Sequence, residues 1–173
     1  NASGNHAKNL VQSVEASLKR LNTGYLDLLW VHMWDFTVRS AEVMRALETL
    51  VRSGKILHVG ISDAPAWVIA EANTVADFRG WSAFTAVQVP YSLARRDVER
   101  EILPMAKALD LAVTPWGILG GGVLTGKYRE EDDTPKRLGP DAVQQKPLEA
   151  GDVVREVAKD VGRTPAQVAL IWV

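Results

Sequence analysis

Short apolar segments alternate with amphipathic segments along almost the whole chain, and this alternation limits the fold more than any other feature. The apolar segments have few polar breaks, as in strands covered on both faces, and they are Leu26–His32, His58–Ser62, Phe84–Val89 and Leu111–Trp116. The amphipathic segments have helical spacing, and they are Ala7–Leu21, Ser40–Val51, Ala66–Asp77, Asp97–Leu109, Gly151–Val161 and Thr164–Val173. Strands separated by helices form parallel sheets with right-handed crossovers, so the sequence predicts an α/β protein.

Two parallel architectures fit this order. The strands recur about every 26–30 residues, close to the ~250 residues that eight units of a (β/α)₈ barrel occupy. A doubly wound sheet is the alternative, but no strand is followed by Gly-x-Gly-x-x-Gly, and the run Gly120–Gly122 lacks that spacing. The segment Gly117–Gly151 is rich in Gly, Pro and charge, and we expect it to be irregular.

Residues at the helix starts suggest caps for two helices and a first-turn proline for a third. Ser3 or Asn5 is placed to cap the first helix, and Thr164 the last, with Pro165 at its first position. Pro65 suits the first turn of the helix that starts at Ala66.

Composition excludes several classes of protein. No window approaches the ~18 uninterrupted apolar residues of a membrane span, and a net charge of −1 argues against a nucleic-acid binder. The absence of cysteine excludes disulfides, a thiolate zinc site and a cysteine nucleophile, and it fits a reducing cytoplasm. We predict no metal site. The polar start at Asn1 and the apolar run Val168–Val173 suggest a piece of a longer protein.

Polar or aromatic residues stand at the carboxyl ends of the four predicted strands. His32 ends the first, Ser62-Asp63 the second and Trp116 the fourth, and Gln88 is near the end of the third. In a parallel barrel these ends converge on the face where active sites lie. Amide, hydroxyl and carboxylate groups can hold an amide, and the face of a Trp ring can stack on a flat ring. These residues predict a site for a planar ligand that carries an amide.

Each residue also has a purely structural interpretation. His32 is compatible with a hydrogen-bonded structural histidine, and Ser62-Asp63 with a plain helix cap ahead of Pro65. Trp116 is compatible with core packing, whereas a buried Gln88 needs partners for its amide. Their shared position at strand ends favours the functional interpretation.

Four stretches in series resemble the aldo-keto reductases, especially the bacterial branch that also resembles potassium-channel β-subunits. The stretches are LDLLWVHMWD, GKILHVGISD, FTAVQVPYSL and VTPWGILGGGVLTGKY. The resemblance spans nearly the whole chain and implies that residues 1–173 form one partial domain. It implies roughly the second half of a (β/α)₈ TIM-type barrel, about four strand–helix units, and a cytoplasmic enzyme that reduces aldehydes and ketones with NADP(H).

The resemblance also implies roles for the strand-end residues. His32 matches the catalytic histidine, while Ser62, Asp63 and Gln88 match residues that hold the nicotinamide carboxamide. Asp63 departs from the commoner Asn, because a carboxylate accepts from the amide NH₂ and does not donate to its carbonyl. Trp116 matches the aromatic residue that stacks on the nicotinamide.

Further roles fall on the segment that follows Trp116, a long cofactor-covering loop at residues 117–150. Cofactor contacts are implied for Gly117, Ile118, Leu119, Gly120, Gly121 and Lys127, with the glycines close to the pyrophosphate. Arg137 is a weaker candidate, for which a solvated loop charge is the favoured interpretation. Met33 and Trp34 are expected to line the substrate pocket, and Tyr91 is a neighbour of that wall.

The family's catalytic Asp, Tyr and Lys have no counterpart in this chain. We therefore expect the 173 residues alone to be inactive and to self-associate through open barrel edges. The alternatives are a nicotinamide-binding regulatory module like the channel β-subunits and a non-catalytic remnant. The predicted partner is a small carbonyl substrate, with no nucleic acid and no membrane. NAD(H) remains open as the cofactor, because the segment that holds the 2′-phosphate has no counterpart here.

Overall fold

A computed structural model describes residues 3–129, 135–139 and 144–173 of the chain. It divides into two compact units, one of Asn1–Gln88 with Arg100–Thr114 and one of Val89–Glu99 with Pro115–Val173. The expected cofactor-covering loop at 117–150 lies partly outside the described residues, at 130–134 and 140–143.

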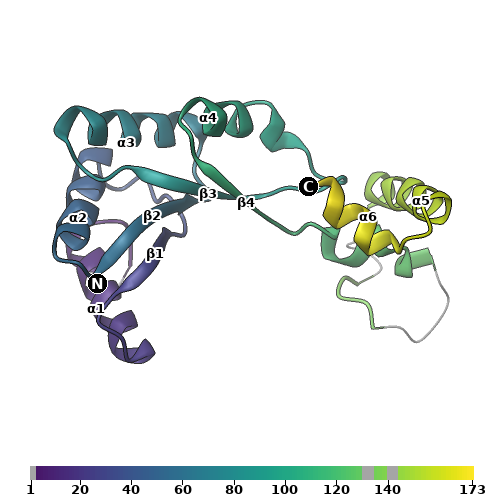
Figure 1. The fold of residues 1–173 in the computed structure, drawn as a ribbon, viewed down its shortest axis with the longest axis horizontal. Helices are drawn as coiled ribbons and strands as arrows, with labels where there is room; N and C mark the ends of the chain where they lie inside the picture. Colours follow the sequence, from purple (N-terminus) through teal and green to yellow (C-terminus); the bar gives the residue numbers. More distant parts are fainter. Residues whose placement is uncertain (1–2, 130–134, 140–143) are drawn as a thin grey trace. The chain divides into compact units, whose positions relative to one another are not determined.

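The first unit alternates strands and helices as predicted (Figure 1). Its helices are α1 (Ala7–Leu21), α2 (Ser40–Arg52), α3 (Ala66–Arg79) and α4 (Ile102–Ala108). The strands of the sheet are β1 (Leu26–Val31), β2 (Ile56–Ser62), β3 (Phe84–Pro90) and β4 (Ala112–Trp116). They lie in the order β1-β2-β3-β4, and the β1–β2 and β2–β3 pairs are parallel. The predicted parallel α/β fold, a partial (β/α)₈ barrel, is confirmed.

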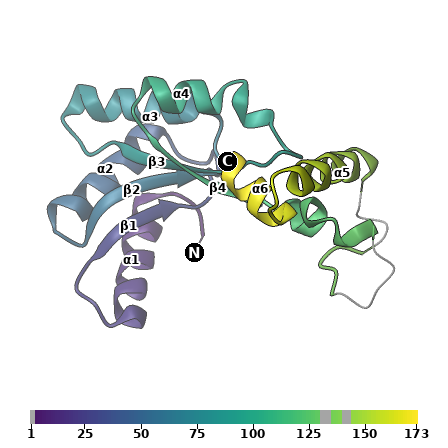
Figure 2. The same ribbon diagram turned by 45° about the vertical axis from the view of Figure 1, so that its right-hand side comes forward.

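Helices cover one side of this sheet and form the core with it (Figures 1 and 2). Ile56, Ile61 and Phe84 of the strands are at most 1% exposed, as are Leu47 of α2 and Ile69 of α3. The buried side chains of β2 and β3 explain why these strands read as continuous apolar runs.

A buried asparagine ties α3 to the start of β3. The Asn73 amide donates to the Phe84 carbonyl at 3.0 Å, and the Phe84 N–H donates to the Asn73 Oδ1 at 2.9 Å. This exchange satisfies both backbone groups of the first residue in the strand.

Three local predictions in the first unit are wrong. The cap of α1 is His6, whose Nδ1 accepts from the Asn9 N–H at 3.2 Å, instead of Ser3 or Asn5. Pro65 lies just before α3 and acts as its cap residue. The expected helix Asp97–Leu109 is a short 3₁₀ helix, Asp97–Glu99, followed by the seven-residue α4.

The second unit is built on a glycine-rich turn packed against two helices. It contains the 3₁₀ helices η2 (Gly120–Thr125) and η3 (Lys127–Arg129) and the helices α5 (Gln145–Asp160) and α6 (Pro165–Trp172). Leu124 of η2, Val154 of α5 and Ala169 of α6 form its buried cluster.

The helix starts in the second unit confirm one prediction and correct another. Thr164 caps α6 as expected, and Gln167 completes a capping box with it. α5 begins at Gln145, six residues before the predicted Gly151. The predicted irregular segment runs to Gly151 and includes Pro147, but proline is tolerated in the first turn of a helix.

Within the described residues, no helix is both long and apolar enough to cross a membrane.

Candidate functional site

The carboxyl ends of β1, β2 and β3 meet at one end of the sheet, as predicted from the strand-end residues. Val31, which precedes His32, lies opposite Ile61, and Ser62 lies opposite Gln88. His32, Ser62 and Gln88 therefore belong to the same end of the first unit.

Ser62 is held by the neighbouring strand. It is 1% exposed, and its hydroxyl donates to the Gln88 carbonyl at 3.1 Å. No side chain caps α3 in this structure, so the interpretation of Ser62-Asp63 as a helix cap is wrong. Asp63 is exposed and has a left-handed backbone with φ of 43°, which turns the chain away from the strand.

The residues after β1 face different surroundings. His32 and Met33 line a hollow of about 390 Å³ together with residues of α1, and Met33 is 58% exposed. Trp34 is 6% exposed and lines a separate hollow with Phe36 and Trp67. The structure thus brings His32 and Met33 together but does not bring Trp34 to the same hollow.

Asn5 fixes the turn that follows His32 and Met33, which the sequence did not suggest. Its side chain donates to the Met33 carbonyl at 3.0 Å, and the Asp35 N–H donates to it at 2.8 Å. Burial works to raise the pKa of the Asp35 carboxyl, but backbone N–H groups of Thr37 and Asn5 hold that pKa below its ordinary value. The turn therefore stabilises the negative charge of Asp35, three residues after His32 in the sequence.

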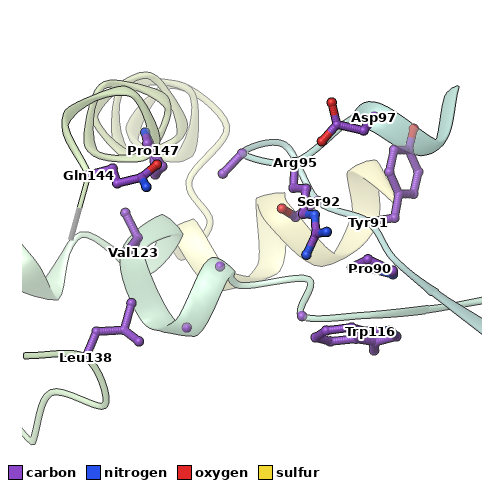
Figure 3. A pocket seen from close by; sticks show the side chains of 14 residues that line it. Pro90, Tyr91, Ser92, Arg95, Asp97, Trp116, Val123, Leu138, Gln144 and Pro147 are labelled. Carbon is purple, nitrogen blue, oxygen red and sulfur yellow. The ribbon is translucent and has the colours of Figure 1, made fainter. Parts of the chain in front are cut away.

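The second unit contains a pocket of about 500 Å³ beside Trp116 (Figure 3). Of the predicted cofactor residues, Trp116, Gly117, Gly120 and Gly121 line it. The other lining residues are Pro90, Tyr91, Ser92, Ala94, Arg95, Asp97, Val123, Leu138, Gln144 and Pro147. Trp116 is 45% exposed, so the interpretation of Trp116 as a core-packing residue is wrong.

Tyr91 links Trp116 to a cluster of charged and aromatic side chains. Its N–H donates to the Trp116 carbonyl at 3.1 Å, and its hydroxyl donates to Glu99 at 2.8 Å. Its ring centroid lies 5.2 Å from that of Trp172, and the Arg96 guanidinium lies over the Trp172 ring, 5.3 Å from its centroid. Burial and the Glu99 carboxylate raise the pKa of the Tyr91 phenol. Tyr91 is therefore a hydrogen-bonded support of the pocket wall.

The glycine run can adopt its conformation only without side chains. Gly121 and Gly122 have φ of 67° and 99°, a region in which L-residues are strained. A Cβ on Gly122 would lie 2.6 Å from the Lys127 Cε, and one on Gly121 would lie 3.0 Å from Leu138. Tyr128 closes this wall, because its hydroxyl donates to the Gly121 carbonyl at 3.2 Å and accepts from the Leu138 N–H at 2.8 Å.

Three predicted contact residues, Ile118, Leu119 and Lys127, do not line this pocket, and neither does the weaker candidate Arg137. Leu119 packs against the core cluster of the unit, Ile118 is half-buried and Arg137 is exposed. The Lys127 ammonium donates to the Pro135 carbonyl at 2.7 Å. In this conformation, Lys127 fastens residues 135–139 to the glycine run.

The model of the aldo/keto reductase family matches residues 1–173. This chain belongs to the aldo/keto reductase family. Its predicted membership, argued from four stretches, is confirmed, whereas the likeness to the bacterial branch stays a prediction.

Among the relatives of this aldo/keto reductase chain are fungal enzymes. It is 44% identical over 172 residues to a norsolorinic acid reductase of Emericella nidulans, covering 99% of this chain and 44% of that protein. It is 38% identical over 174 residues to an aryl-alcohol dehydrogenase of Pestalotiopsis microspora, covering 100% of this chain and 45% of that protein. The chain therefore spans less than half the length of these relatives.

Proposed function

We propose that this chain is the nicotinamide-binding part of an NADP(H)-dependent reductase that converts an aromatic aldehyde or ketone to an alcohol. The observation that carries the proposal is the pocket of the second unit, where a half-exposed Trp ring adjoins a side-chain-free glycine wall. The aromatic substrate class comes from the names of the relatives, one of which acts on aryl alcohols.

The described residues fit a nicotinamide dinucleotide. The flat nicotinamide ring can stack on the face of Trp116. The pyrophosphate can approach the backbone N–H groups of Gly120 and Gly121, because these residues have no side chain. For the carboxamide, the proposal rests on the family resemblance, which assigns it to Ser62, Asp63 and Gln88. NADPH and NADH share all these groups, so the proposal of NADP(H) rests on the family resemblance alone.

His32 would act on the substrate. The bound cofactor supplies the hydride, and the oxygen of the substrate carbonyl gains negative charge as the hydride arrives. A histidine N–H donates a hydrogen bond that favours this charge. His32 is exposed at the end of β1, where a substrate can reach it.

The first experiment tests binding and turnover together. Residues 1–173 replace the matching part of the Emericella nidulans norsolorinic acid reductase, and the fusion is assayed with NADPH and an aromatic aldehyde. We expect saturable turnover, which His32→Ala lowers ~10²–10⁴-fold with little change in the Kd of NADPH. Trp116→Ala weakens cofactor binding by about 1–3 kcal/mol, with base–aromatic stacking as the analogue.

The outcomes separate the candidate functions. A fusion that binds NADPH tightly without turnover favours the regulatory module. A fusion that neither binds NADPH nor turns over substrate contradicts the proposal. Full activity of His32→Ala with an unhindered aldehyde makes His32 a structural residue.

A further inference from the structure

Arg95 brings a positive charge to the pocket beside Trp116, where the proposed function has so far used no cation. In Figure 3 its guanidinium points into the space between its own segment and the Trp116 ring. Among the hydrogen bonds and ion pairs within the described residues, none involves this guanidinium. Its five N–H donors are therefore available to a ligand.

The backbone on either side of Arg95 is fixed. The Ser92 N–H donates to the Arg95 carbonyl at 3.1 Å, and the Arg95 N–H donates to the Ser92 carbonyl at 3.0 Å. The next residue, Arg96, donates twice to Glu99, at 2.8 and 2.9 Å. Of two neighbouring arginines, Arg96 supports the turn and Arg95 is presented to the pocket.

No acidic side chain of this turn pairs with the Arg95 guanidinium within the described residues. Asp97 is the acidic residue in the pocket lining, but Figure 3 shows its carboxylate on the opposite side of the segment from the Arg95 guanidinium. Asp97 and Arg95 form no ion pair within the described residues. An anionic group in the pocket would thus meet a positive charge.

We propose that Arg95 binds the pyrophosphate of the nicotinamide dinucleotide, an inference that rests on the proposed function. A guanidinium forms paired, charge-assisted hydrogen bonds with phosphate oxygens. The pocket volume of about 500 Å³ is in the range of sites that enclose a small ligand. With the nicotinamide on Trp116, the phosphate within reach is the one attached to the nicotinamide ribose. That phosphate is common to NADPH and NADH.

The experiment measures Kd by calorimetry on the full chain for four ligands: NADPH, NADH, nicotinamide mononucleotide and nicotinamide riboside. The riboside lacks the phosphate and reports on the rest of the pocket. The variants are Arg95→Gln, Arg95→Lys and, as a matched control, Arg163→Gln. Arg163 is an exposed arginine of the same unit that does not line the pocket.

We expect Arg95→Gln to raise the Kd of the three phosphate-bearing ligands about three- to tenfold and to leave the riboside unchanged. The difference from the unsubstituted chain shrinks as salt is added, because its origin is electrostatic. Arg95→Lys raises the Kd of these ligands less than Arg95→Gln does, because lysine keeps the positive charge although it lacks the paired donors. Arg163→Gln behaves like the unsubstituted chain.

Three results overturn the inference. One is an unchanged Kd of all three phosphate-bearing ligands in Arg95→Gln, which leaves the proposed function intact. The second is a loss confined to NADPH, which assigns Arg95 to the 2′-phosphate. The third is an equal loss for the riboside, which means that the substitution has damaged the pocket itself. If the unsubstituted chain binds none of the four ligands, the proposed function is contradicted as well.

Discussion

At the scale of single residues, Glu48 is a negative charge in a position that is 8% exposed. Its carboxylate accepts from the Ser82 N–H at 2.7 Å and from the Ser82 hydroxyl at 2.8 Å, and it pairs with Arg52. The Ser82 N–H and Arg52 hold the pKa of the Glu48 carboxyl below its ordinary value. The ionised carboxylate thus joins α2 to the segment before β3 more strongly than the protonated carboxyl does.

This pKa shift sets the pH dependence of Glu48→Gln. A carboxyl with a lowered folded-state pKa adds stability that is complete above its unfolded pKa of ~4.3 and is lost as pH falls through the folded value. We expect Glu48→Gln to lower the free energy of unfolding by about 1–3 kcal/mol at pH 7. Urea unfolding from pH 7 to 3 should show this difference shrinking below pH ~4.

The control for this prediction is Glu101→Gln. Glu101 is exposed and its side chain makes no cap hydrogen bond with α4, so we expect little change in stability. A Glu48→Gln deficit that stays constant down to pH 3 would mean that packing, and not the ionised carboxylate, stabilises this contact.

Residues at strand ends could be predicted from the sequence because their position follows from the strand itself. His32, Ser62 and Gln88 are each at or next to the end of an apolar run, and parallel pairing brings those ends together. Arg95 gave no such signal. Arg95 is the last residue of a tight turn and is followed directly by Arg96, and only the hydrogen bonds of the folded chain distinguish the two arginines.

At the scale of elements, the pairing of β1 with β2 depends on a glycine. Gly60 lies opposite Trp30, and a Cβ on Gly60 would come within 2.4 Å of the Trp30 ring. The indole therefore occupies the space that a side chain at residue 60 would need. The sequence contains both residues, but their contact follows from the register of the two strands.

Gly60→Ala should destabilise the first unit by about 1–3 kcal/mol, because the Trp30 ring must move away from its position. Gly24→Ala is the control: a Cβ there meets nothing within 4 Å, so its effect on urea unfolding should be small. In the double variant with Trp30→Leu, the cost of Gly60→Ala should be smaller than in the unsubstituted chain. Equal costs in both backgrounds would contradict the contact.

Helix starts were harder to predict than helix centres. α6 was placed correctly because Thr164 and Pro165 give a strong local signal, and its capping box is formed. The sequence predicts too late a start for α5, because Pro147 within the polar segment resembles a loop residue, whereas in the structure it belongs to the first turn. Sequence alone does not distinguish a proline before a helix from one inside its first turn.

At the scale of the whole molecule, the sheet of the described residues ends in β1 on one side and β4 on the other. Leu28 of β1 is 38% exposed and Leu57 of β2 is 48% exposed. Exposed strand edges and apolar side chains promote pairing with other chains. We expect the 173-residue chain to self-associate, with an apparent mass in sedimentation equilibrium that rises with protein concentration. A concentration-independent monomer mass would contradict this expectation.

The last prediction is that the 173 residues alone do not reduce aldehydes. A carbonyl that accepts a hydride becomes an alkoxide and needs a proton donor nearby. The resemblance assigns that role to a tyrosine whose pKa is lowered by a lysine, and this chain has three tyrosines. Tyr25 is next to the amino-terminal end of β1, at the other end of that strand from His32.

The other two tyrosines are already engaged. The Tyr91 hydroxyl donates to Glu99 and its pKa is raised, the wrong direction for a ready proton donor. The Tyr128 hydroxyl bonds both Gly121 and Leu138. We therefore expect the purified chain, mixed with NADPH and a reactive aldehyde, to show no saturable loss of absorbance at the NADPH band, whereas the fusion described above does. Turnover by the chain alone that disappears in His32→Ala would overturn this prediction, because a proton donor other than these tyrosines would then have to lie near His32.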